Sequence, residues 1–124
     1  IGDVRLDANW QKENPDAMAR ILAGMAKRRH PDSARPEWLE GAARQLAARR
    51  EHDTWSRLGE IGCPTFVCGG LHDGIAPPKN LSALAEGIRE SELAWFEGGH
   101  LFLLQDRNAW PRIIDFLLTR DAGG

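Results

Sequence analysis

The second half of the chain predicts an α/β fold with a parallel sheet. The run Pro64–Gly70, PTFVCGG, is a continuous apolar stretch bounded by proline and glycine, which is typical of a strand buried on both faces. Leu93–Phe96 is a second short apolar run, and each run is followed by apolar residues at helical spacing. The order strand, helix, strand, helix indicates a parallel crossover unit, which is right-handed by default.

The first 57 residues predict helices and loops without a convincing strand. Asn14 is a typical N-cap, Pro15 suits the first helical position, and Pro31 ends this helix. A second helix is expected to begin near Pro36, and Asp53 can cap a short continuation. The residues expected to be buried are Ala17, Met18, Ile21, Leu22 and Met25 in the first helix, and Trp38, Leu39, Ala42, Ala43 and Leu46 in the second.

Two further helices are expected in the second half of the chain. The pair Pro77–Pro78 opens the first of them, and Asn108 can cap the second. Their expected buried residues are Leu81, Leu84, Ala85 and Ile88 in the first, and Ile113, Ile114, Leu117 and Leu118 in the second. We therefore expect a helical segment at residues 1–57 and an α/β part at residues 58–124.

The composition is that of an ordinary soluble globular protein, since 42% of the 124 residues are hydrophobic and 27% are charged. The formal net charge of -2 provides no electrostatic footprint for nucleic acid or an anionic membrane. No apolar run approaches the roughly 18 residues of a membrane span, and Ile1–Arg5 lacks the pattern of a signal peptide. Because the first residue is not Met, we expect a fragment or a processed product.

The two cysteines, Cys63 and Cys68, predict free thiols. On one strand they would lie about 16 Å apart at roughly 3.3 Å per residue and would point to opposite faces, which excludes a disulfide. Their spacing fits no zinc pattern, and the four histidines show no metal-ligand repeat. A reducing cytoplasm is therefore the expected location.

An acid and a histidine follow the two predicted strands. Asp73 comes after the first strand and His100 after the second. In a parallel sheet, the carboxyl ends of the strands open onto one edge, where ligands collect. There a carboxylate can accept the Nδ1 proton of an imidazole, fix its tautomer and stabilise the imidazolium formed in general-base catalysis. An Asp in H-D-G or a lone His in a loop is mostly structural, so the joint pattern carries the interpretation.

From about Trp55 to Leu118 the chain resembles the C-terminal end of an α/β-hydrolase. In that family a strand like PTFVCGG is followed by a segment like HDGIAPP with the triad acid, and a later strand ending in FEGGH supplies the triad histidine. The resemblance implies that Asp73 is the acid and His100 the histidine. It also implies that residues 1–57 are a helical cap, or lid, and residues 58–124 the C-terminal part of the hydrolase core.

The chain departs from the family because it contains no nucleophile elbow, G-x-S-x-G, and no oxyanion-hole loop. The resemblance therefore implies a fragment of a serine-type hydrolase for an ester or related acyl bond, whose nucleophile (Ser, Cys or Asp) lies upstream. We expect this fragment to be nearly inactive by itself. We also expect it to associate with other copies or with the missing N-terminal part, because a two-stranded sheet leaves an unpaired edge.

Two alternatives remain open. The first is a non-catalytic binding or oligomerisation module derived from the same fold, in which Asp73 and His100 are structural. The second is phosphate binding by Gly69–Gly70, which is weak because the chain has neither G-x-G-x-x-G nor G-K-[ST].

The resemblance implies a small, ester-like substrate but leaves its identity open, since carboxylic esters, lactones, carbon–carbon bonds of diketones, epoxides and haloalkanes are all processed on this fold. Ile75 and Leu101 stand next to the two candidate catalytic positions and are candidate pocket walls. Trp38 in the expected cap is a further candidate, although a Trp at helical spacing is more often plain core. No metal and no cofactor is implied.

Overall fold

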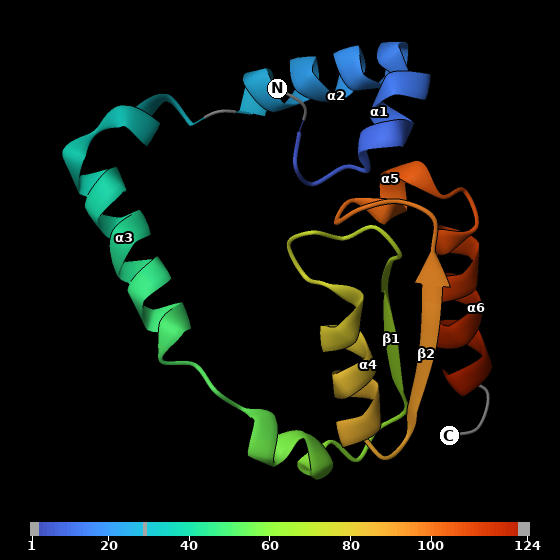
Figure 1. The fold of residues 1–124 in the computed structure, drawn as a ribbon. Helices are drawn as coiled ribbons and strands as arrows, with labels where there is room; N and C mark the ends of the chain where they lie inside the picture. The colour runs from blue at the N-terminus through green and yellow to red at the C-terminus, as the bar shows by residue number, and fades with distance from the viewer. Residues whose placement is uncertain (1–2, 29, 122–124) are drawn as a thin grey trace. The chain divides into compact units, whose positions relative to one another are not determined.

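The computed structural model describes residues 3–28 and 30–121 of the chain. The chain forms two compact units, of which one comprises Ile1–Glu13 with Arg57–Gly124 and the other Asn14–Ser56. Figure 1 shows the ribbon of both. No helix in the described ranges is long and apolar enough to cross a membrane.

The larger unit is built on a sheet of two parallel strands, β1 (Thr65–Gly70) and β2 (Ser91–Phe96). Thr65 pairs with Ser91 and Gly70 with Phe96, so the two strands end together. Helix α4 (Pro78–Gly87) connects them, and α5 (Phe102–Gln105) and α6 (Ala109–Asp121) follow β2. Helices α4 and α6 cover opposite faces of the sheet (Figure 1). The predicted order of strands and helices, and their parallel pairing, are confirmed.

The core of this unit lies between α4 and the sheet. Leu58, Val67 and Ile88 are buried together there. Leu58 comes from η2 (Trp55–Glu60), the short 3-10 continuation that Asp53 was expected to cap. The Asp53 side chain does accept a hydrogen bond from the Trp55 N–H, at 2.9 Å. The partly buried residues around the cluster are Ile61, Leu81, Ala85 and Leu93.

The opposite face of the sheet packs on α6 through aromatic and cationic contacts. The rings of Phe66 and Phe116 stack with their centroids 5.0 Å apart. The Arg112 guanidinium lies 5.1 Å from the Phe66 ring centroid and forms an ion pair with Glu92 of β2. These contacts fix which side of α6 faces the sheet.

The buried face that the sequence predicted for α6 is largely wrong. Ile114, Leu117 and Leu118 are 50%, 56% and 66% exposed, and only Ile113 is half-buried. The helix has two apolar sides, and the one with Ala109 and Phe116 is buried because Phe116 stacks on Phe66. In α4, Leu84 is also more exposed than expected, at 38%, because it lines an open cavity.

The smaller unit contains α2 (Pro15–Arg28), the 3-10 turn η1 (Pro31–Ala34) and α3 (Pro36–Arg50). Both predicted helices are confirmed, but neither contains a buried residue. The expected burial of the α3 face is wrong: Trp38, Leu39 and Leu46 are 46%, 57% and 53% exposed, and Ala42 and Ala43 are exposed as well. The physical reason is that α3 packs against η1, which is too small to cover this face.

The start of the chain has structure that the sequence did not predict. A short helix, α1 (Ala8–Glu13), follows the segment 3–7. Ile1–Glu13 group with Arg57–Gly124, although the sequence assigned all of residues 1–57 to a cap. The cap assignment itself stays a prediction.

Candidate active site

Asp73 is held in a tight turn directly after β1. Its Oδ1 accepts hydrogen bonds from the N–H groups of Ile75 and Ala76, both at 2.8 Å. Its own N–H donates to the Gly70 carbonyl at 3.3 Å. The residue is only 8% exposed. This side-chain-to-backbone turn leaves Oδ2 as the carboxylate oxygen that faces outward from the turn.

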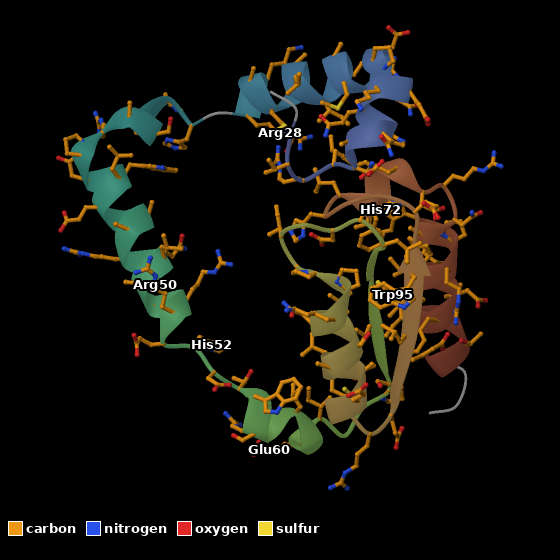
Figure 2. The ribbon with its side chains drawn as sticks, in the orientation of Figure 1. Arg28, Arg50, His52, Glu60, His72 and Trp95 are labelled. Carbon is orange, nitrogen blue, oxygen red and sulfur yellow. The ribbon has the colours of Figure 1, made fainter. Side chains whose placement is uncertain are left out.

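His100 lies on the turn that follows β2. Gly98 has φ +122°, a left-handed conformation that favours glycine, and so reverses the chain after the strand. Two backbone hydrogen bonds join this turn to the Asp73 turn: the Leu71 N–H donates to Phe96 and the His72 N–H donates to Gly98, both at 2.9 Å. Figure 2 shows His72 at this end of the sheet. The turns that carry Asp73 and His100 therefore lie side by side, connected through their backbones.

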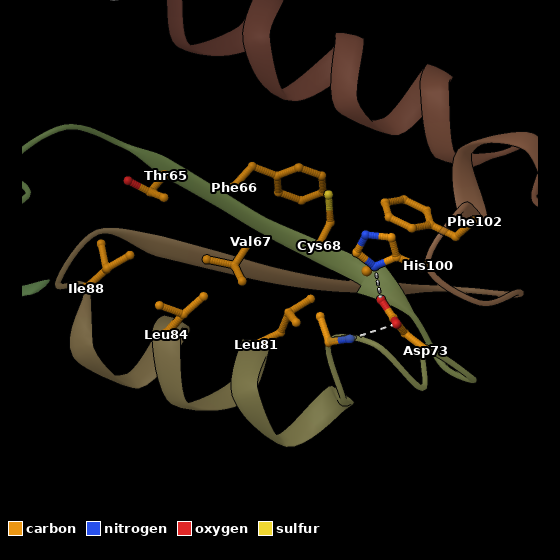
Figure 3. Close-up of a pocket in the computed structure, with 12 residues that line it drawn as sticks. Thr65, Phe66, Val67, Cys68, Asp73, Leu81, Leu84, Ile88, His100 and Phe102 are labelled. Atoms are coloured by element: carbon orange, nitrogen blue, oxygen red, sulfur yellow. Dashed lines mark hydrogen bonds and ion pairs between the residues drawn. The ribbon is translucent and has the colours of Figure 1, made fainter. Parts of the chain in front are cut away.

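The structure brings the two candidate catalytic side chains into contact. His100 Nδ1 and Asp73 Oδ2 are 2.8 Å apart (Figure 3). Because the ionised carboxylate can only accept, the contact requires a proton on Nδ1, and in the neutral ring Nε2 is then the basic nitrogen. The His100 side chain is 41% exposed and that of Asp73 only 6%. The arrangement can orient an imidazole and stabilise its protonated form.

The surroundings of Asp73 favour its ionised form. Burial by itself raises the pKa of this carboxyl group. The hydrogen bonds from the Ala76 N–H, the His100 ring and the Ile75 N–H act the other way, as does the charge of His100, and together they lower the pKa below its ordinary value. Asp73 is therefore a carboxylate at neutral pH.

A cavity of about 370 Å³ opens beside the pair, along β1 (Figure 3). Apart from the acid–histidine pair its lining is almost wholly apolar, and it includes five consecutive residues of β1 and none of β2. The lining residues are Thr65, Phe66, Val67, Cys68, Gly69, Asp73, Ala76, Leu81, Leu84, Ile88, His100 and Phe102. Apolar volume therefore adjoins the imidazole directly.

The three candidate pocket residues from the sequence do not line this cavity. Ile75 is 50% exposed and Leu101 is half-buried. Trp38 belongs to the other unit, where its ring stacks on His30 with centroids 4.6 Å apart. Their role in a substrate pocket stays a prediction.

Cys63 and Cys68 are both free, as predicted, although Cys63 precedes β1 rather than lying on it. Within residues 3–28 and 30–121, no group of three or more His, Cys, Asp or Glu side chains is placed to hold a metal ion.

Two residues that the sequence did not mark, Gln105 and Arg5, support the histidine turn. Gln105 accepts a hydrogen bond from the Gly99 N–H at 2.9 Å, and the Arg5 carbonyl accepts one from the Leu101 N–H at 2.8 Å. Neither residue belongs to a recognisable local pattern. The hydrogen-bond partner of Arg5 is Leu101, which lies almost the whole chain away. Only its position five residues after His100 sets Gln105 apart.

Comparison with known proteins gives two sequence relatives and one structural relative; no protein-family model matches the chain. The relatives are two bacterial proteins named "Putative carbamate hydrolase RutD". The protein from Agrobacterium fabrum (strain C58) is 36% identical over 116 residues, which cover 92% of this chain and 42% of the relative. The protein from Rhizobium rhizogenes (strain K84) is 35% identical over 92 residues, covering 74% of this chain and 32% of the relative. The chain thus spans about two fifths or less of the length of these curated relatives.

A solved structure with a similar fold is that of MGS-M2, an α/β-hydrolase enzyme from a deep-sea metagenome library of the Medee basin. Its crystal structure matches with a TM-score of 0.73 over 92% of this chain and 41% of its own, at 18% sequence identity. At this identity the likeness concerns the fold. The resemblance drawn from the two strand-end motifs is therefore confirmed at that level: the chain has part of the α/β-hydrolase fold, with two parallel strands, their helices and a helical N-terminal segment.

Proposed function

We propose that this chain supplies the acid and the histidine of a catalytic triad whose nucleophile lies elsewhere in a longer hydrolase. The observation that carries the proposal is the 2.8 Å contact between His100 Nδ1 and Asp73 Oδ2 at the carboxyl ends of two parallel strands. The lowered pKa of Asp73 supports it, because an ionised carboxylate both orients the ring and stabilises the imidazolium.

In the proposed reaction, His100 Nε2 removes the proton of the nucleophile as its oxygen or sulfur attacks an acyl carbon. His100 later returns that proton to the leaving group, and the Nδ1 proton remains in the hydrogen bond to Asp73 throughout. If the nucleophile is a carboxylate instead, His100 activates the water that releases the product. Either role needs a neutral ring with its proton on Nδ1, which is the neutral tautomer that the contact with Asp73 selects.

The proposed substrate is a small molecule with an ester or related acyl bond. The names of the two sequence relatives favour a carbamate, in which the acyl carbon carries both a nitrogen and an oxygen. The apolar cavity beside His100 suits an uncharged substituent. The free thiols of Cys63 and Cys68 suit a reducing compartment, and we propose the cytoplasm.

The 124-residue chain is expected to show no nucleophile of its own. With nitrophenyl acetate it should give slow hydrolysis without a stoichiometric burst, since no G-x-S-x-G elbow is present. An organophosphonate should leave its mass unchanged, and in a longer protein whose nucleophile is a serine it should label a residue outside these 124. The His100→Ala variant provides the background rate. A phosphonate adduct on the 124-residue chain would contradict the proposal.

A second candidate function is association through the free edge of β1. The Thr65 N–H donates to the Glu90 carbonyl, and the Leu71 N–H donates to the Phe96 carbonyl. Every second residue of β1, starting from Thr65, therefore turns its backbone hydrogen-bonding groups toward β2. Because the bonds to one neighbour alternate along a parallel strand, the N–H and C=O groups of Phe66 and Cys68 point to the opposite edge. In the described part of the chain that edge has no third strand. The apolar cavity along it would be filled by pairing with a second copy.

Light scattering at micromolar concentration should therefore report a dimer. A Leu84→Lys variant should be monomeric, because Leu84 lines the cavity beside the free edge and a lysine would place a charge there. The matched control is Leu118→Lys on the exposed side of α6, which should remain dimeric. A monomeric wild-type chain, or a dimer abolished only by Leu118→Lys, would contradict pairing through β1.

A further inference from the structure

The turn that carries His100 rests on the segment Asp3–Asp7, which is almost one hundred residues away in the sequence. The Leu101 N–H donates to the Arg5 carbonyl at 2.8 Å, and Leu6 is only 4% exposed. A Cβ on Gly99 would lie 2.9 Å from the Arg5 oxygen and 3.0 Å from the Asp7 nitrogen. The backbone of this segment is therefore packed directly against the backbone of the histidine turn. We call Asp3–Asp7 the brace.

Gln105 joins the brace to the histidine turn. Its Oε1 accepts from the Gly99 N–H at 2.9 Å and, more weakly, from the Asp7 N–H at 3.4 Å. The opposite orientation of the amide would place its NH₂ group against two N–H donors, so the acceptor must face the turn. Its Nε2 is buried and has no hydrogen-bond partner among the described residues. The side chain thus serves as an acceptor at a cost, since a buried donor without a partner is unfavourable.

The brace itself is tied to α1 by a second glutamine. Gln11 Nε2 donates to the carbonyls of Asp3 and Leu6, and Gln11 Oε1 accepts from the Asp3 N–H, each at 2.9 Å. The Arg5 side chain forms an ion pair with Asp3. These contacts close Asp3–Asp7 into a compact loop, so that it can act as a fixed support rather than as a loose end.

We propose that Gln105, acting through the brace, is a positioning residue for His100; this inference rests on the proposed triad role of the histidine. The residues on both sides of His100 are held by their N–H groups, Gly99 by Gln105 and Leu101 by Arg5. Gly98 and Gly99 have no side chains with which to anchor the turn, so hydrogen bonds to their backbone hold it: the Gly98 carbonyl accepts from the His72 N–H, and the Gly99 N–H donates to Gln105. A shift of about 1 Å at the backbone would break a 2.8 Å contact between Nδ1 and Oδ2.

Three substitutions at Gln105 separate positioning from mere packing. Gln105→Leu keeps the approximate volume and removes the acceptor. Gln105→Glu keeps an acceptor at the same reach, and Gln105→Asn keeps the amide but is one methylene too short. Gln45→Leu is the matched control, because Gln45 lies exposed on α3 in the other unit.

The measurement is the Nδ1 proton of His100 in proton–nitrogen NMR spectra of the 124-residue chain, with Tm recorded for each variant. In the wild type the hydrogen bond to Asp73 should keep this proton visible and slow to exchange. Gln105→Leu should speed its exchange about tenfold, which corresponds to about 1.4 kcal/mol. Gln105→Glu and Gln45→Leu should exchange like the wild type. If Gln105→Leu does not fold, Gln105→Asn takes its place with the same expected result.

Three results would count against the inference in different ways. Wild-type exchange in both Gln105→Leu and Gln105→Asn would overturn it and leave the Asp73–His100 pair intact. Equal acceleration in Gln105→Glu and Gln105→Leu would overturn it too, because the acceptor would then be irrelevant. If the wild-type chain itself lacks a protected Nδ1 proton, the contact between His100 and Asp73 is absent in solution and the proposed function fails first.

Discussion

Replacing Gly70 by alanine is expected to destabilise the larger unit and to separate the turns that carry Asp73 and His100. A Cβ at this position would lie 2.2 Å from the Gly99 oxygen and 2.4 Å from the Gly98 oxygen. Carbon and oxygen atoms do not approach closer than about 3.3 Å without strain. Both oxygens belong to the backbone and cannot rotate away, so the histidine turn would have to move by about 1 Å.

The expected cost of Gly70→Ala is about 1–3 kcal/mol, the range of overpacked buried sites. The shift would also weaken the hydrogen bond from the His72 N–H to Gly98, which joins the two turns. Gly70 has no positive φ, so the effect is one of space rather than of backbone conformation. The matched control is Gly74→Ala, in the turn next to Asp73, where a Cβ would meet no atom within 4 Å.

Urea unfolding and the protected Nδ1 proton of His100 measure the two consequences of Gly70→Ala separately. Gly74→Ala should change the free energy of unfolding by less than about 0.5 kcal/mol and should keep the protected proton. Equal stability of the two variants would show that the histidine turn does not pack closely against Gly70.

The elements next to the candidate site could be predicted because their signals are local. PTFVCGG is apolar throughout and ends in glycines, which a buried parallel strand and a tight exit both require. The chain direction of two parallel strands then places Asp73 and His100 at one edge, as the 2.8 Å contact shows. The apolar pattern and the parallel topology together were sufficient to predict that Asp73 and His100 lie close to each other.

The faces of the helices could not be predicted, because the choice depends on partners rather than on periodicity. In α6 both Phe116 and Leu117 belong to apolar stripes, and only the stacking of Phe116 on Phe66 decides between them. In α3 the spacing of Trp38 and Leu46 indicates an amphipathic helix, but spacing does not provide the surface that would cover it. Amphipathicity predicts that a helix has an apolar side, not that this chain buries it.

The contacts that support the histidine turn could not be predicted from the sequence for a different reason. Leu6 is among the most buried residues of the described chain, yet it stands alone between polar neighbours with no apolar repeat. The backbone of Arg5, Leu6 and Asp7 packs against Gly99 of the turn, about one hundred residues later, so neither propensity nor periodicity carries the information.

Replacing Asp73 by asparagine is expected to reverse the tautomer of His100. In the wild type the carboxylate accepts the Nδ1 proton, which leaves Nε2 free of a proton in the neutral ring. The asparagine side chain can still accept from Ile75 and Ala76 through its oxygen, and its NH₂ group would then donate to Nδ1. The proton would move to Nε2, which could no longer act as a base. The nitrogen chemical shifts of the His100 ring report the tautomer directly, and an Nε2 without a proton in Asp73→Asn would contradict this account.

The same substitution should change how stability depends on pH. The pKa of Asp73 is lower in the folded chain than in the unfolded one, so its ionised form stabilises the fold above the unfolded value of about 3.9, and this contribution is lost as pH falls through the lower folded value. Asp73→Asn lacks it at every pH. The wild type should therefore exceed the variant by about 1.5–3 kcal/mol near pH 7, the range of hydrogen bonds to a charged group, and the difference should vanish well below pH 4. Asp115→Asn, an exposed carboxylate of the same unit, is the control and should show little difference. A gap between wild type and Asp73→Asn that persisted unchanged to pH 2 would mean that packing, not the charge of Asp73, carries the effect.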